Sequence, residues 1–102
     1  MNMEKELKAI YSTRKSFYGK AIVRTEIFEN IEHVELLSYN TLVADYTYYK
    51  DDNKKVYKYF GYFSCTTSSH QKEFFKQLGL DDKEAKDLMK SKEFKQLIKE
   101  VK

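Results

Sequence analysis

The stretch SCTTSSHQKEF (residues 64–74) gathers the side chains of this sequence that are best suited to chemistry. A thiol, four consecutive hydroxyls, an imidazole and an amine stand at the start of a helix-like run. A helix start leaves four backbone N–H groups unpaired, and a Ser or Thr hydroxyl can accept one of them. Ser68, three residues before Gln71, has the spacing of a capping box, and Thr67 is the competing cap. One cap accounts for only one of the four hydroxyls.

The remaining hydroxyls favour a second use. Together they could line a mouth at the positive end of the helix dipole, where phosphate or carboxylate would bind. An imidazole and an amine follow closely in the sequence and could add positive charge. Because no glycine-rich phosphate loop is present, a capped helix with spare surface hydroxyls explains the same residues. The candidate binding residues of this stretch are Thr66, Thr67, Ser68, His70 and Lys72.

Catalytic and metal-binding patterns are sparse in this sequence. Cys65 lies five residues before His70, and such a pair could supply a thiol nucleophile. A cysteine at the end of a strand, however, is more commonly a buried and inert thiol. His33 and His70 lie on different predicted elements, so no two-histidine metal motif is present. We therefore expect a protein that is not an enzyme and that uses no metal and no cofactor.

The chain before this stretch predicts a β-sheet. Residues 17–64 alternate between two side-chain faces and are rich in β-branched and aromatic residues. Breaks fall near residues 28–30, at 39–41 and at KDDNK (50–54), and connections this short favour antiparallel neighbours. The sequence therefore predicts a four-stranded antiparallel meander.

The chain after this stretch predicts helices. Apolar residues at helical spacing occur in the run that ends at Gly79, in DDKEAKDLMK and in SKEFKQLIKEV. We expect two or three short C-terminal helices packed on one face of the sheet, which is an α+β fold. A chain of this length predicts a single domain, residues 1–102. Its parts are an N-terminal segment (1–15), the antiparallel sheet (16–65) and a helical part (67–102).

Tyrosines and basic residues mark a second candidate surface. Seven of the nine tyrosines fall in the last three predicted strands or their turns, so the helix-free face is expected to be tyrosine-rich. Such a face suits a second copy, a host protein or stacked bases, although half-buried tyrosines with wet hydroxyls explain it equally well. Residues 1–24 carry a net charge of +4 against +3 for the whole chain, which suits an anionic partner or an ordinary solvated surface. The candidates here are Lys15, Tyr18, Lys20, Tyr39 and Tyr62.

The composition is that of a globular chain. It is 41% hydrophobic and 34% charged, and its single cysteine excludes an internal disulfide. The first residues include no apolar run long enough for a signal peptide, and no segment is apolar enough to span a membrane. We expect a cytoplasmic protein without a membrane partner.

Three motifs stand out along the chain: SFYGKA (16–21), LLSYNTLVA (36–44) and GYFSCTTSSHQKEFFKQLG (61–79). They resemble a family of small proteins carried by phages and mobile elements of Gram-positive bacteria, which is a domain of unknown function. The resemblance covers about residues 11–80 and implies a genomic setting more than a chemistry, while the tail from residue 81 departs from it. The residues that match the pattern are Phe17, Tyr18, Gly19, Lys20, Ser38, Tyr39, Thr41, Tyr62, Ser64, Thr66, Thr67, His70, Glu73 and Phe74.

Two function classes remain open. The first is a non-enzymatic phage or mobile-element protein that binds and inhibits a host defence component, such as a CRISPR effector. The second is a small nucleic-acid or nucleotide-binding module that uses the tyrosine-rich sheet face and the hydroxyl-lined helix start. A homodimer is compatible with either class.

Overall fold

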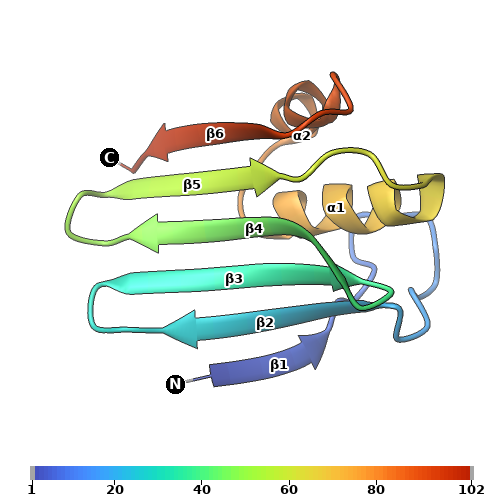
Figure 1. The fold of residues 1–102 in the computed structure, drawn as a ribbon, viewed down its shortest axis with the longest axis horizontal. Coiled ribbons are helices and arrows are strands. Elements are labelled where there is room, and N and C mark those ends of the chain that lie inside the picture. The colour runs from blue at the N-terminus through green and yellow to red at the C-terminus, as the bar shows by residue number, and fades with distance from the viewer. Residues whose placement is uncertain (1, 102) are drawn as a thin grey trace.

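The computed structural model describes residues 2–101 as a six-stranded antiparallel sheet with two helices (Figure 1). Each strand pairs with its neighbours in sequence, so the order across the sheet is β1-β2-β3-β4-β5-β6. No helix among the described residues is long and apolar enough to cross a membrane. The elements are β1 (Asn2–Glu6), β2 (Ala21–Ile27), β3 (Ile31–Ser38), β4 (Thr41–Tyr49), β5 (Lys54–Tyr59), α1 (Cys65–Gln77), α2 (Asp82–Met89) and β6 (Lys95–Glu100).

Two tight turns fix how the central strands pair. Between β3 and β4, Tyr39 and Asn40 have φ angles of 51° and 67°, and positive φ at both central residues is what a type I′ hairpin turn requires. Between β4 and β5 a turn forms at the predicted KDDNK segment, where Asn53 has a φ of 51°. Asn is one of the few residues that adopts this backbone region readily. These turns place β3, β4 and β5 side by side.

The prediction of a four-stranded sheet followed only by helices is wrong, although the class is α+β. The segment predicted as a third helix instead forms β6, which pairs with β5 from Lys95 opposite Tyr59 to Glu100 opposite Lys54. Its apolar residues fit a helical period, but pairing with β5 satisfies the backbone groups of that sheet edge. Likewise, residues 2–6 of the predicted N-terminal segment form β1 along β2. Because β6 lies within it, the predicted helical part (67–102) is not wholly helical.

One face of the sheet carries the core, and the helices cover it at one end (Figure 1). α1 packs against β3 and β4, and α2 packs against β6. One buried tyrosine of this core keeps a polar partner, since the Tyr57 hydroxyl donates to the Leu78 carbonyl at 2.7 Å. Its largest fully buried side chains include Leu36, Tyr57, Tyr59, Phe74 and Phe75.

The tyrosine-rich face is the helix-covered one, so the expected tyrosine-rich open face is wrong. Tyr46, Tyr57 and Tyr59 are buried in the core beneath the helices. Alternation separates the two faces of a strand but does not say which face a helix will cover. The open face instead has a charged row, in which each residue pairs with the next across neighbouring strands: Glu4, Arg24, Glu35, Asp45 and Lys58.

Candidate functional site

The N-cap of α1 lies three residues before Thr67 and four before Ser68, the two predicted caps. Ser64 is the N-cap, with extended backbone (φ −163°, ψ 168°), and its hydroxyl accepts a hydrogen bond from the Thr67 N–H at 3.1 Å. The Ser64 carbonyl accepts the next bond, from the Ser68 N–H at 2.9 Å. The prediction that Thr67 or Ser68 caps the helix is therefore wrong. Residues 66–69 lie inside the first helical turns, where their side chains point in different directions around the axis.

One of these hydroxyls faces the sheet and joins a buried polar cluster. The Ser38 hydroxyl, at the end of β3, lies 2.8 Å from Thr67 Oγ1 and 2.8 Å from His70 Nδ1. All three residues are buried. Burial lowers the pKa of His70, and the positive charge of Arg14 lowers it further. The side chains of Thr67 and His70 thus tie α1 to the end of β3 and do not form a solvent-facing mouth.

A second buried group holds the loop between β1 and β2 against the helix. Glu73 Oε1 accepts the backbone N–H groups of Tyr11 and Ser12, each at 2.9 Å. Gln77 Nε2 donates to Glu73 Oε2 at 2.8 Å and to the Lys8 carbonyl at 2.6 Å. Because Glu73 is only 2% exposed, these bonds replace the hydrogen bonds that water would otherwise donate to its carboxylate. Glu73 and Gln77 together hold residues 8–12 against α1.

Gln71 makes a third link from α1 to the sheet. Its Nε2 donates to the carbonyls of Val43 in β4 and Gly61 after β5, each at 3.0 Å. The sequence indicates Gln71 only as the capping-box partner of Ser68 and indicates no role for Glu73 or Gln77. The available signal was the helical spacing, because residues at i, i+3 and i+7 share one face of a helix. His70, Glu73 and Gln77 have that spacing and serve the same purpose.

Two exposed tyrosines stand at neighbouring turns above this framework. Tyr18 is 77% exposed and Tyr39 is 53% exposed, and their φ angles are 53° and 51°. A non-glycine residue with positive φ is uncommon, and a bulky one is a marked outlier that costs free energy. The turns are joined by a backbone bond, in which the Tyr39 N–H donates to the Lys20 carbonyl at 2.9 Å. The fold therefore holds two bulky aromatics outward at some cost in stability.

Basic residues accompany Tyr18 on its loop. Arg14, Lys15 and Lys20 lie on the same exposed loop as Tyr18, and Arg14 acts electrostatically on His70. The His70 ring also lies 6.0 Å from the Tyr39 ring, between their centroids. We call the group of Arg14, Lys15, Tyr18, Lys20 and Tyr39 the tyrosine patch. It unites four of the predicted candidates, namely Lys15, Tyr18, Lys20 and Tyr39.

The other predicted candidates lie apart from this patch or are already paired. The Tyr62 hydroxyl is 3.5 Å from Cys65 Sγ, and the Lys92 ammonium lies 5.0 Å from the centre of the Tyr62 ring. Lys72 forms an ion pair with Asp82 at 3.1 Å. Cys65 is exposed, so the expectation of a buried thiol is wrong. Its predicted position at a strand end is also wrong, because it is the first residue of α1.

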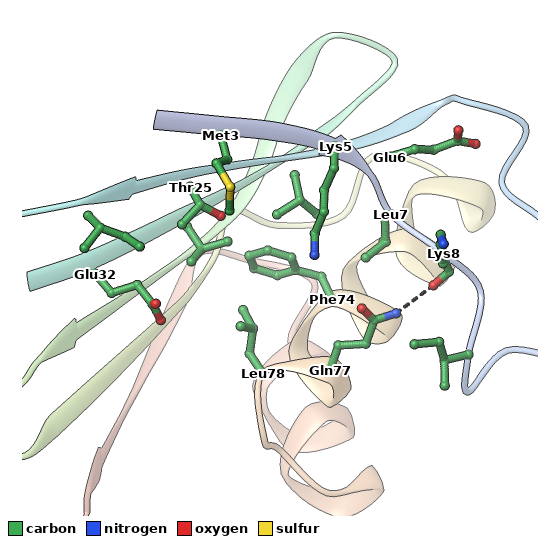
Figure 2. A pocket seen from close by; sticks show the side chains of 14 residues that line it. Met3, Lys5, Glu6, Leu7, Lys8, Thr25, Glu32, Phe74, Gln77 and Leu78 are labelled. Carbon is green, nitrogen blue, oxygen red and sulfur yellow. Dashed lines mark hydrogen bonds between the residues drawn. The ribbon is translucent and has the colours of Figure 1, made fainter. Parts of the chain in front are cut away.

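A separate hollow lies between the first strands and the C-terminal half of α1 (Figure 2). Its volume is about 470 Å³, and its apolar lining includes Val23, Val34, Phe74 and Leu78. Figure 2 shows the amine of Lys5 reaching from β1 into this space beside Phe74. Within residues 2–101, no group of three or more His, Cys, Asp or Glu side chains could hold a metal ion.

Comparison with protein families identifies one family that this chain matches. The model of a family of unknown function, DUF8033, matches residues 5–96. The chain belongs to this family. No curated protein and no solved structure shows significant similarity to it.

Membership of DUF8033 corrects one expectation about the C-terminal tail. The match reaches residue 96, so α2 and the start of β6 belong to the family domain rather than to an added tail. In this DUF8033 chain the S-x-TT-x-x-H-x-x-E motif has a structural explanation. Ser64 caps α1, Thr67 and His70 bond to Ser38, and Glu73 clamps the loop that carries Tyr18.

Proposed function

We propose that this DUF8033 protein is a non-enzymatic binding protein, encoded by a phage or mobile element, that binds and inhibits a host defence component such as a CRISPR effector. The observation that carries the binding role is the tyrosine patch. Its two aromatics are held outward by strained turns, although neither contributes to the core. The phage setting and the class of target rest on the resemblance of the SFYGKA and S-x-TT-x-x-H motifs.

The composition of the patch suits a protein interface. Tyrosine and arginine are over-represented among residues that dominate binding energy, because they offer large contact areas with few rotatable bonds or with several donors. The bond between Ser38 and His70 lies next to the turn that carries Tyr39, and Glu73 holds residues 11 and 12 of the loop that carries Tyr18, so both segments are fixed in advance. A preformed surface loses less conformational entropy on binding than a mobile one.

The nucleic-acid alternative loses two of its three original supports and keeps the basic first quarter of the chain. It required a tyrosine-rich open face, but Tyr46, Tyr57 and Tyr59 are buried. It also required a hydroxyl-lined mouth, whereas Thr67 is bonded internally. The basic residues of the patch still make nucleic acid an outcome that the experiment must be able to detect.

The test replaces both tyrosines by asparagine, a residue that tolerates positive φ. The variant Tyr18→Asn/Tyr39→Asn should melt at or above the temperature of the wild type, because strain is relieved. It should nevertheless lose capture of a host protein from lysate and lose inhibition of CRISPR interference in cells. Removing two central aromatics of an interface weakens binding by about 30-fold or more. The matched control is Tyr49→Asn, at the far end of β4, where the side chain is 39% exposed.

Three results would count against the proposal. Unchanged capture and inhibition by the asparagine double variant would show that the patch is not the binding surface. Recovery of nucleic acid alone, lost on nuclease treatment, would favour the alternative. A loss of function equal in Tyr49→Asn and in the double variant would point to a different face.

A further inference from the structure

The hollow between β1–β3 and α1 exists because the helices cover only part of the core face. α1 packs against β3 and β4, so the helix-facing side of β1 and β2 lies beside the helix rather than under it. Val23 and Val34 form part of the floor, while Phe74 and Leu78 form the wall supplied by α1. The volume of about 470 Å³ is within the range of pockets that hold small ligands.

Lys5 gives this apolar hollow its chemical character. Its register partner across β1 and β2 is Val23, so the lysine projects on the same side of the sheet as the core. Figure 2 shows its amine within the hollow, beside Phe74. No hydrogen bond or ion pair joins this amine to any of the described residues 2–101. Lys5 is exposed to solvent, and its ammonium stands beside apolar walls without a paired carboxylate, so an anion bound there would gain a charge-assisted hydrogen bond.

Acidic side chains limit where that anion can lie. Glu6, at the end of β1, is engaged by the Gly19 N–H, which donates to its Oε1 at 2.7 Å. Glu32 lies at the other end of the hollow, away from Lys5, as Figure 2 shows. An anionic group is therefore favoured beside Lys5 and disfavoured beside Glu32. The apolar floor of Val23 and Val34 lies between these two ends.

We propose that this hollow binds a small apolar carboxylate. The carboxylate pairs with the Lys5 ammonium, and the hydrocarbon part lies on Val23, Val34, Phe74 and Leu78. The site is separate from the tyrosine patch and does not depend on the proposed inhibitory function. A different explanation for Lys5 is that an inward-pointing charge on the edge strand β1 discourages pairing with other sheets. The two roles differ in what they predict for ligand binding.

Sodium octanoate and 1-octanol are the probes, because they share an apolar chain and differ in charge. In an amide NMR titration, octanoate should shift residues of β1, β2 and residues 74–78, and it should bind more tightly than octanol. Lys5→Met should weaken the binding of octanoate by about tenfold, the factor that corresponds to one charge-assisted hydrogen bond. The same variant should bind octanol at least as tightly as the wild type does. Lys54→Met, at an exposed position at the start of β5, is the matched control and should leave both affinities unchanged.

A second variant tests the location without touching the charge. Thr25 lines the hollow from β2 and is only partly buried, so Thr25→Phe should fill the space and abolish binding of both probes. Octanoate binding that is absent in the wild type, or equal to that of octanol, would overturn the proposal. So would an affinity that Lys5→Met leaves unchanged, in which case the lysine serves only to guard the sheet edge.

Discussion

Replacing Glu73 by glutamine should detach the loop that presents Tyr18. Glu73 accepts two backbone N–H groups and the Gln77 amide, and it is 2% exposed. Glutamine at this position retains one acceptor oxygen but turns an NH₂ group towards the Gln77 donor. Two amide donors then face each other where the wild type has a bond of 2.8 Å. Gln77 can rotate to relieve this clash only by giving up its bond to the Lys8 carbonyl.

The size of the effect follows from these contacts. The variant loses the charge of the acceptor and one buried hydrogen bond, and hydrogen bonds to charged groups contribute about 1.5–3 kcal/mol each. We therefore expect the free energy of unfolding to fall by about 2–3 kcal/mol. For a domain of this size that corresponds to a decrease in Tm of roughly 10–20 °C. Glu93→Gln, at an exposed position before β6, should change neither quantity.

Urea unfolding and amide hydrogen exchange together measure this prediction. The exchange of the Tyr11 and Ser12 amides should accelerate in Glu73→Gln beyond the increase seen for the β3 and β4 amides, because their acceptor is weakened. Captured partner should also decrease, since the same loop carries the tyrosine patch. A change in unfolding free energy of less than about 0.5 kcal/mol, the ordinary range of surface substitutions, would refute the reasoning. So would unchanged protection of the Tyr11 and Ser12 amides.

Two further predictions concern the start of α1. Ser64→Ala should lower the free energy of unfolding by about 1 kcal/mol because it removes the N-cap acceptor, whereas Ser68→Ala should leave it nearly unchanged in the same urea titration. Because burial lowers the pKa of His70 in the folded state, the unfolded chain binds more protons below its pKa of about 6.5. The contribution of His70 to the free energy of unfolding should therefore be constant above that pH and should decrease as the pH falls below it. In thermal melts between about pH 7.5 and 5, His70→Gln should remove this pH-dependent loss of stability.

The sequence predicts those parts of the fold that have local signals. Alternation and the KDDNK turn indicate the strands that became β2 to β5, and the run DDKEAKDLMK, predicted as a helix, contains α2. β6 was mistaken for a helix because its apolar residues fit a helical period, and the free edge of β5 is visible only in the folded sheet. β1 was missed because all five of its residues are exposed and show no alternation. Its existence depends on backbone pairing with β2 alone.

The sequence also predicts only part of the candidate site, namely the part that residue type alone can indicate. Tyr18, Tyr39, Lys15 and Lys20 were identified from residue type, and the structure brings them to one loop and one adjacent turn. The roles of Thr67 and His70 could not be predicted, because their partner Ser38 is about thirty residues away in sequence. The strained backbone of the two tyrosines carries no clear sequence signal either. Only the glycine after Tyr18 hints at a turn there.

Site-specific photo-cross-linking tests the central claim most directly. A p-benzoylphenylalanine is introduced at Tyr18, at Tyr39 or, as a control, at Tyr49, and the cells are irradiated with the host defence system present. The account predicts a covalent adduct with one host protein from positions 18 and 39 and none from position 49. Adducts from position 49 alone, or none from positions 18 and 39 in a protein that still inhibits interference, would contradict it.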